Sequence, residues 1–209
     1  GKTIEAVATA TIASKAPVIL NSAGTVTEIS GSSDGIGTAT AFTATSVYPN
    51  YINSSYDLNA DKVVVFYTNG STYLVAAVGT VSGTSISFGT PVVANSTGST
   101  HLSSSYDSTA QKIVVAWTDS SLGKAMVGTV SGTSISFGAE TTFNASNTMH
   151  SNCVYDPNAN KTVIAYRDAD GTNYGTAIVG TVSGTGISFG TEVTFDTAQS
   201  ITYYIAGEI

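Results

Sequence analysis

Apolar residues in this chain occur in short runs and alternations that predict β-strands. The segment Lys112-Ile-Val-Val-Ala-Trp117 is rich in β-branched and aromatic residues, which favour strands. The segment Thr133-Ser-Ile-Ser-Phe137 alternates polar and apolar residues, with the period of a half-buried strand. No segment shows a helical pattern over more than one turn, so the sequence predicts an all-β fold.

Turn residues divide the best-preserved stretch into four expected strands. Asp107-Ser-Thr-Ala-Gln111 follows the first strand, and its Asp and Ser side chains can bond to backbone amides two residues on. Ser131-Gly132 predicts a tight turn before the fourth strand, because Gly adopts backbone angles that other residues resist. The expected strands span residues 102–106, 112–117, 124–130 and 133–137, the last continued by residues 139–143.

One unit of about fifty residues is repeated along the chain. The dodecapeptide Val-Gly-Thr-Val-Ser-Gly-Thr-Ser-Ile-Ser-Phe-Gly occupies Val78–Gly89 and Val127–Gly138, and returns with one change, Gly186, at Val179–Gly190. A Tyr-Asp pair recurs with it, at positions 56–57, 106–107 and 155–156. Such a period is typical of propellers, solenoids and similar arrays. Four short antiparallel strands per unit favour a propeller-like fold, with a β-sandwich or a solenoid array as the alternatives.

The two ends of the chain depart from the repeat. Residues 1–45 are expected to form a divergent N-terminal β unit, and residues 46–209 to contain three blade-like repeats and the first strand of a further unit. Phe42 corresponds to Phe143, near the end of a repeat. Ser200-Ile-Thr-Tyr-Tyr-Ile205 stands where that further strand is expected. Its backbone must find a partner, either in the N-terminal region or in a neighbouring chain.

The repeat also predicts which side chains form the core. An aromatic residue stands five positions after the same Lys in each copy, at Tyr67, Trp117 and Tyr166. We expect these rings to pack between neighbouring sheets, since repeated aromatic residues serve first the core between repeats. A ligand-stacking platform is the alternative. The other side chains expected to be buried are Ile86, Val114, Ile135, Val163 and Ile187.

Composition and charge limit the partners of this chain. Only 10% of its residues are charged, against roughly a quarter in an average globular domain, and 42% are hydrophobic. The net charge is −7, and the seven basic residues are spread along the sequence, which argues against nucleic acid or an anionic membrane surface as a partner. No apolar run is long enough to predict insertion into a membrane. Low charge and many hydroxyl groups suit an extracellular or virion surface.

Candidate chemistry is sparse, and each candidate has a structural alternative. His101 and His150 occupy equivalent positions and could line a channel or bind a metal. We interpret them as polar edge residues, because the other copies have no His there. Asp57, Asp107 and Asp156 are interpreted as turn caps rather than calcium ligands, since the terminal Glu of a calcium loop is missing.

No set of residues predicts catalysis, a cofactor or a metal site, and the ligand is left open. Asp168-Ala-Asp170-Gly171 is the best calcium candidate, but the other copies do not preserve it. Cys153 stands alone in an expected strand, which favours a small buried side chain over a nucleophile. The carboxylates are scattered, with no pair placed for glycoside hydrolysis. Arg167 is the one arginine, so the arginine cluster of a sialidase is missing. Sequons for glycosylation occur at Asn53, Asn69, Asn95 and Asn144.

The repeat motif resembles a known group of proteins. Tyr-Asp-x-x-x-x-Lys-x-Val-(Val/Ile), followed by the dodecapeptide, is similar to repeats in fibre and appendage proteins of tailed bacteriophages, especially marine ones. The likeness covers about residues 46–209, and the segment Val7–Ile29 also looks like small β modules of phage virion proteins. The resemblance implies a place on the virion surface, attachment to a host, and other virion proteins as partners. It transfers no catalytic residue.

We therefore expect a virion fibre protein that is not an enzyme and displays loops on a rigid β scaffold. Its low charge makes self-association tolerable, so we expect a homo-oligomer. Binding to host-surface glycans through aromatic and hydroxyl groups is the expected activity. The alternative is a secreted carbohydrate-binding or carbohydrate-active β-propeller protein of cellular origin.

Overall fold

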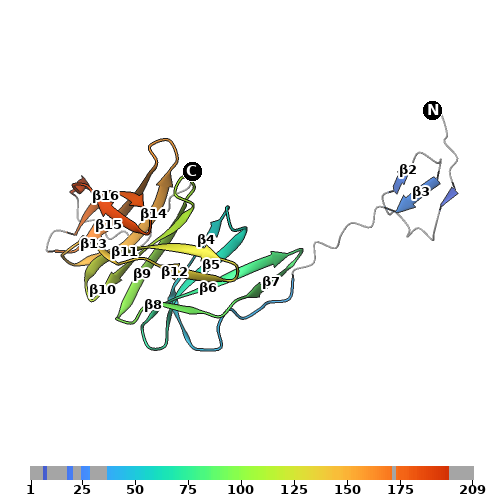
Figure 1. The fold of residues 1–209 in the computed structure, drawn as a ribbon, viewed down its shortest axis with the longest axis horizontal. Coiled ribbons are helices and arrows are strands. Elements are labelled where there is room, and N and C mark those ends of the chain that lie inside the picture. The colour runs from blue at the N-terminus through green and yellow to red at the C-terminus, as the bar shows by residue number, and fades with distance from the viewer. Residues whose placement is uncertain (1–6, 9–17, 21–24, 29–36, 171–172, 198–209) are drawn as a thin grey trace. The chain divides into compact units, whose positions relative to one another are not determined.

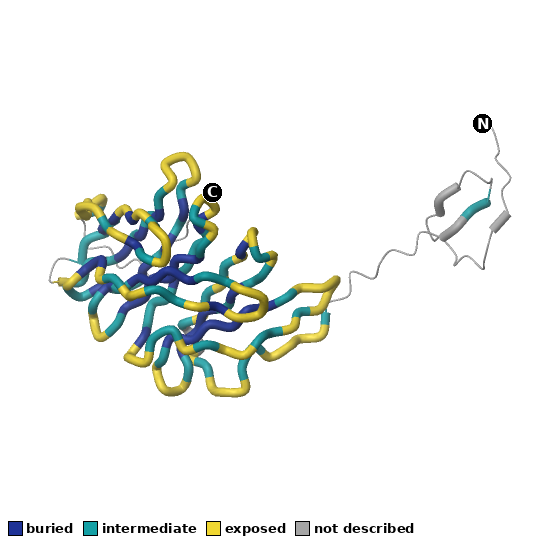
Figure 2. The backbone as a smooth tube through the Cα atoms, viewed as in Figure 1, coloured by how far each residue is buried: buried dark blue, intermediate teal, exposed yellow. Residues whose placement is uncertain are grey.

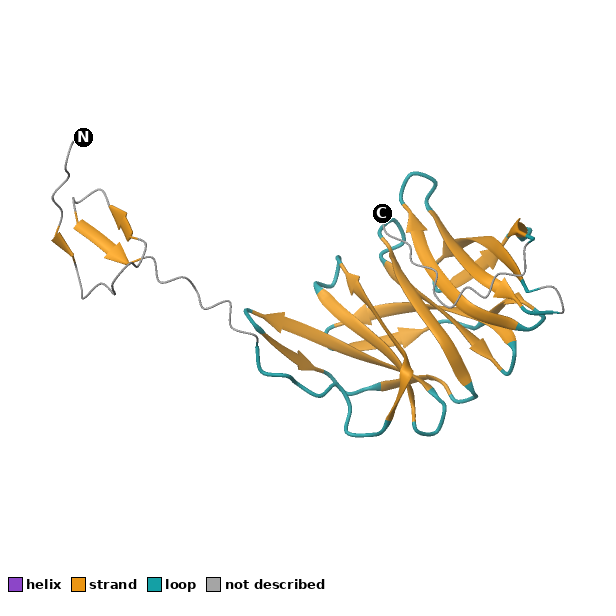
Figure 3. Ribbon diagram, turned by 180° about the vertical axis from the view of Figure 1, so that it is seen from behind, coloured by secondary structure: helices purple, strands orange, loops and turns teal. Residues whose placement is uncertain are grey.

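The computed structural model describes residues 7–8, 18–20, 25–28, 37–170 and 173–197. Within these residues every regular element is a strand and none is a helix, as Figure 3 shows. The chain divides into two compact units, Gly1–Thr38 and Ala39–Ile209, which we call the N-terminal unit and the array. The all-β prediction is confirmed.

The described strands of the N-terminal unit form one small sheet. They are β1 (Val7–Ala8), β2 (Val18–Leu20) and β3 (Thr25–Glu28), in the order β1-β3-β2. Strand β3 runs parallel to β1 and antiparallel to β2. The turn residues of Asn21-Ser-Ala-Gly24 separate β2 from β3 in the sequence.

Three antiparallel sheets follow one another along the array (Figure 1). The first sheet contains β4 (Val47–Asp57), β5 (Lys62–Asn69), β6 (Leu74–Ser82), β7 (Ser85–Phe88) and β8 (Val92–Asn95). The second contains β9 (Ser99–Asp107), β10 (Lys112–Asp119), β11 (Leu122–Ser131), β12 (Ser134–Phe137) and β13 (Thr141–Asn144). The third contains β14 (Thr148–Asp156), β15 (Lys161–Asp168), β16 (Tyr174–Ser183), β17 (Gly186–Phe189) and β18 (Val193–Asp196). In each sheet the first four strands pair in chain order, and the fifth pairs with the third.

The expected fourth strand of each repeat is divided in two. In the second sheet β12 pairs with the end of β11, and β13 pairs with its beginning, around Gly123. Between them Gly138 still donates its amide to the Val127 carbonyl at 2.9 Å. The same division recurs in the first and third sheets. Each sheet therefore has four rows of strand, with the outer row interrupted.

The repeated Ser-Gly-Thr segment forms a two-residue hairpin loop. Ser131 pairs with Ser134 across the turn, which leaves Gly132 and Thr133 as the loop. Gly132 has a φ of 60°, and a type II′ turn requires a positive φ at this first loop position. The equivalent glycines have φ values of 58° and 61°. The conserved letters of the three copies thus set the same hairpin register in all three sheets.

Neighbouring sheets pack face to face, and alternate residues of each second strand point to opposite neighbours. In β10, Ile113, Val115 and Trp117 contact the first sheet, whereas Val114 and Ala116 contact the third. All five side chains are fully buried. Figure 2 colours the buried segments of the array dark blue. A strand covered on both faces needs a continuous apolar run, which explains Ile-Val-Val-Ala-Trp. We call the face toward the preceding sheet the rear face and the face toward the following sheet the forward face.

The side chains predicted to be buried are buried where their face of the sheet packs against a neighbouring sheet. Ile86 and Val163 were expected in the core but are only partly buried, so these two predictions are wrong. Ile86 lies on the rear face of the first sheet and Val163 on the forward face of the third, at the two ends of the stack. The described residues provide no complete sheet opposite either of them. The predictions are confirmed for Val114, Ile135 and Ile187.

Large rings fill the contacts between sheets. Tyr67, Trp117 and Tyr166 are fully buried, which excludes an exposed stacking platform. Trp117 and Tyr166 pack between neighbouring sheets as expected. Tyr67 is covered by Phe42 instead of a described sheet. Phe143 packs on Tyr166 with ring centroids 5.2 Å apart. Opposite Trp117 the position equivalent to Phe143 holds Ala94, so the largest ring of the series meets a small side chain. A larger ring on one sheet is thus matched by a smaller side chain on the sheet that it packs against.

Phe42 marks the beginning of the array. Its ring lies 5.0 Å from that of Tyr67, as Phe143 lies 5.2 Å from Tyr166. The expected correspondence of Phe42 with Phe143 is thus seen in the packing. Because this segment packs on the first sheet, the chain divides after Thr38, before the expected boundary at residue 45. Residues 200–209, expected to begin a further unit, lie outside the described residues.

We predict that Ile135→Ala destabilises the protein by about 2–5 kcal/mol, because its side chain fills a packed core. Ile86→Ala removes the same atoms at the equivalent position of the first sheet. Since Ile86 is only partly buried, its loss should cost clearly less. Urea unfolding of both variants measures the difference, and equal losses would contradict the assignment of Ile86 to an open end face.

Candidate functional site

A groove of about 500 Å³ lies between the first turns of the second and third sheets. Thr109, from the turn between β9 and β10, and Lys112, the first residue of β10, line one side of it. Asn160, from the turn between β14 and β15, lines the other with Lys161, the first residue of β15, and Thr181 of β16. The lining mixes hydroxyl, amide, carboxylate and ammonium groups, which can donate or accept hydrogen bonds, with apolar surface from Ala110 and Val182.

A chain of hydrogen bonds crosses between the two turns at this groove. The Tyr155 hydroxyl donates to Thr109 Oγ1 at 2.7 Å, and that hydroxyl donates to Asn160 Oδ1 at 2.7 Å. Thr109 belongs to the second sheet and the other two residues to the third. The two walls of the groove are therefore joined to each other and hold a defined shape.

Asp caps fix the backbone of each turn. The Asp107 carboxylate accepts hydrogen bonds from the amides of Thr109 at 3.0 Å and Ala110 at 2.8 Å. Asp57 and Asp156 bond in the same way to their own turns. The interpretation of these aspartates as turn caps is confirmed, since Oδ1 of each accepts from one or two backbone amides of its own turn. The residue before each Lys adopts a left-handed backbone, with φ of 55° at Asp61, 55° at Gln111 and 54° at Asn160.

A second cluster, which we call the ring row, joins the first strands of the three sheets. It consists of Tyr51 in β4, His101 in β9 and His150 in β14. The Tyr51 and His101 ring centroids lie 5.5 Å apart, and the two histidine rings lie 4.7 Å apart in an edge-on arrangement. His101 and His150 have φ of 51° and 52°, at the point where the pairing of each strand with its neighbour shifts register. These bulges turn the rings toward one another.

Burial governs the ionisation of the ring row. Burial lowers the pKa of His101 to about 4, and the nearby His150 lowers it further in the same direction. The pKa of His150 is also lowered, first by burial and then by the charge of Arg167. Both rings are therefore neutral at neutral pH. Within the described ranges no group of three or more His, Cys, Asp or Glu side chains is arranged to hold a metal ion.

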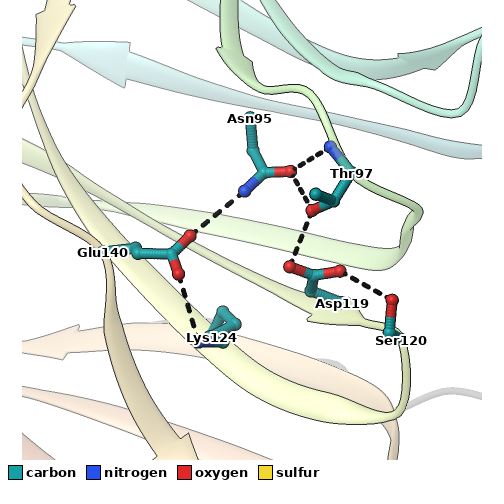
Figure 4. A network of polar contacts seen from close by, with 6 residues as sticks. All are labelled: Asn95, Thr97, Asp119, Ser120, Lys124 and Glu140. Carbon is teal, nitrogen blue, oxygen red and sulfur yellow. Dashed lines mark hydrogen bonds and ion pairs between the residues drawn. The ribbon is translucent and has the colours of Figure 1, made fainter.

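A polar network joins the first and second sheets at the end of each sheet that lies away from the groove (Figure 4). The Thr97 hydroxyl donates to Asp119 at 2.7 Å. Glu140 accepts from the Asn95 amide and from Lys124, each at 3.1 Å. All these groups are paired with one another, so we assign the network to structure rather than to ligand binding. Between the second and third sheets, the Ser146 hydroxyl donates to Asp168 at 3.2 Å, in the same way as Thr97 donates to Asp119.

The remaining candidates from the sequence have structural roles. Asp168 accepts hydrogen bonds from the Ser146 hydroxyl and from the Asp170 amide, both at 3.2 Å, as a turn cap does. Gly171, the last residue of that calcium candidate, lies outside the described residues. Cys153 is buried, as expected, and burial raises the pKa of its thiol to about 12. A thiol with that pKa is a poor nucleophile at neutral pH.

Sequence reasoning found parts of both clusters but not their assembly. It singled out His101 and His150 but missed Tyr51, although each of the three stands five residues before the repeated Tyr-Asp pair. That shared spacing could have identified Tyr51 as the equivalent of the two histidines. It missed the groove as well, because nothing in one repeat shows that its turn lies beside the turn of the next. The sequon side chains are already engaged: Asn53, Asn69 and Asn95 accept hydrogen bonds, and Asn144 is buried.

No protein-family model matches this chain, and no curated protein is significantly similar to it. The part of the chain that the structure describes contains no helix long and apolar enough to cross a membrane.

We predict that the protein loses stability as the pH falls from 6.5 toward about 4. The folded state holds His101 at a pKa of about 4, below the ordinary 6.5, so the unfolded chain takes up protons that the folded chain excludes. His101→Asn removes this titration and keeps a residue that tolerates a left-handed backbone. Urea midpoints across that range should fall less in the variant than in the unsubstituted protein. Parallel pH curves would show that His101 does not titrate with this shift.

Proposed function

We propose that this chain is a non-enzymatic structural and adhesive module of a virion surface, of the fibre type, that binds host-surface glycans. The observation that carries the proposal is the groove between the second and third sheets. Its lining combines hydroxyl, amide and ammonium groups with apolar surface, as a glycan combines hydroxyl groups with apolar ring faces. Its position at the ends of stacked sheets suits a scaffold that presents loops outward.

The chemistry of the groove supports recognition by hydrogen bonds. Lys112 and Lys161 each bring an ammonium group with three donors, and Thr181 brings a hydroxyl. The bonds of Asp107 to its own turn hold one wall before any ligand arrives. A preformed polar site loses little conformational entropy on binding, which favours affinity for a flexible glycan.

We infer further that the three sheets are successive blades of a propeller-like array. The first strands β4, β9 and β14 contact one another more extensively than the outer strands of neighbouring sheets do. The sheets therefore converge along one edge and spread along the other, as blades do around an axis. This arrangement supports the proposal because it repeats the same turn at each junction.

The low charge of the chain and the resemblance of its repeat to phage fibre repeats support a place on the outside of a particle. Charged residues make up only 10% of the sequence, and hydroxyl groups cover much of the exposed strand faces. Such a surface contacts neighbouring virion proteins without strong electrostatic repulsion. The rival placement is a secreted lectin of cellular origin.

We predict that Lys112→Ala with Lys161→Ala weakens glycan binding by roughly tenfold or more, since two charged donors leave the groove. A glycan array identifies a binding oligosaccharide, and titration calorimetry with it measures the loss. Lys124→Ala is the matched control, because its ammonium binds Glu140 at the opposite end of the sheet. Equal losses in the control, or no loss in the double variant, would exclude this groove as the glycan site.

Mass spectrometry of purified particles from the source tests the virion placement. We predict that the chain is present at a fixed ratio to the other structural proteins. Recovery only in the particle-free culture fluid would favour the secreted lectin. The glycan measurement stays informative in either case, because it concerns the groove and not its location.

A further inference from the structure

The contact between neighbouring sheets inside the array shows what an end face of the stack is built to meet. Leu102 and Tyr106 of β9 pack with Val64 and Phe66 of the first sheet in one apolar cluster. The Tyr106 hydroxyl also accepts a hydrogen bond from the Asn59 amide of that sheet at 3.2 Å. The first strand of one sheet thus covers the forward face of the sheet before it.

Hydrogen bonds at equivalent positions join the sheets at both junctions. Thr68 Oγ1 donates to the carbonyl of Ser99, the first residue of β9, at 2.8 Å. Thr118 Oγ1 donates in the same way to the carbonyl of Thr148, the first residue of β14, at 3.0 Å. In the third sheet Arg167 stands at this position, and its guanidinium donates to Asn173 Oδ1 and to Met149 Sδ of the same chain.

The rear end of the array exposes one half of this interface. Ile52 and Tyr56 of β4 are equivalent to Leu102 and Tyr106, and 49% and 48% of their surface is exposed. Tyr155, at the same position in the third sheet, is only 6% exposed, because the second sheet lies against it. The apolar side of β4 therefore has the chemistry of a packed surface without a described neighbour.

The forward end of the array exposes the other half. Val179 and Phe195 of the third sheet are 45% and 60% exposed. Their equivalents in the second sheet, Val127 and Phe143, are buried against the third sheet. Large exposed apolar patches of this kind mark sites of protein association. The two ends of one chain are thus the two halves of an interface that the array already forms twice.

We propose that copies of this chain associate head to tail, with β4 of one copy packed on the forward face of the third sheet of another. The occupant is a second copy because the contact continues the established interface between sheets. The two surfaces are different, so the association is heterologous and adds copies in one direction, into a closed ring or a fibre.

Phe42 regulates this association. It occupies on Tyr67 the place that Phe195 of an incoming copy takes, since Phe143 packs on Tyr166 in the same way. The segment from Ala39 to Ser46 forms no strand. The Gly70 amide donates a hydrogen bond to the Ser46 carbonyl at 2.9 Å, which joins the segment to the first sheet. Its displacement therefore breaks no strand ladder, and Phe42 acts as an internal competitor of Phe195.

A disulfide between copies tests the predicted register. Ser55 Oγ lies 2.6 Å from Ser104 Oγ, and at the next junction Ser105 Oγ lies 3.4 Å from Cys153 Sγ. The next pair in this series joins Val154 of one copy to Ser54 of another. The full chain with Cys153→Ser, Ser54→Cys and Val154→Cys should form a ladder of covalent oligomers on oxidation. Each single-cysteine variant in the Cys153→Ser background should stay monomeric on a non-reducing gel.

Dimers of a single-cysteine variant would overturn the head-to-tail register, because they require two identical surfaces to meet. A disulfide formed within one chain would show that the chain covers its own end. Absence of any cross-link in the double-cysteine protein would also overturn the proposal.

Sedimentation velocity over a concentration series tests the competition. Phe195→Ala should weaken self-association about tenfold, and Phe42→Ala should strengthen it. Val93→Ala is the matched control, because Val93 is 53% exposed and its equivalent Thr142 stays exposed although the second sheet has neighbours on both sides. Thermal unfolding confirms that each variant is folded. Association that is absent throughout, or unchanged by Phe195→Ala, would refute the proposal.

Discussion

The packing of each sheet against its neighbours is the constraint on which the rest of this structure depends. A β-sheet with apolar residues on both faces is stable only if both faces are covered, and the second sheet meets this condition in full. Trp117 contacts the sheet before it and Ala116 the sheet after it, both without exposed surface. The first sheet meets the condition in part, through Phe42 on Tyr67.

Both functional candidates are products of this stacking. Packed sheets lie about 10 Å apart, so equivalent turns of neighbouring sheets come side by side and leave a groove between them. At the bulges of the first strands, the His101 and His150 ring centroids lie 4.7 Å apart across the junction. Neither site belongs to one repeat. Each arises at a junction, which explains why the repeated letters alone did not reveal it.

Prediction of the site from the sequence succeeded where the cause is local. The Asp107 cap follows from the residues of its own turn: the hydrogen bond from the Thr109 amide, two residues on, is the predicted one, and the Ala110 amide adds a second. Burial of Cys153 follows from its place in a strand. The grouping of Tyr51 with His101 depends on contacts between strands about fifty residues apart, and a residue pattern within one strand contains no information about them.

The sequence by itself determined the strands, the hairpin loops and the direction in which each side chain points. These features depend on alternation and on the backbone freedom of residues such as Gly132, which act over a few positions. Only the tertiary structure decided which faces are covered. Ile86 and Ile135 have the same local sequence, yet one lies at the end of the stack and the other inside it. Burial, and with it the lowered pKa of His101, is set by neighbours that the local sequence does not specify.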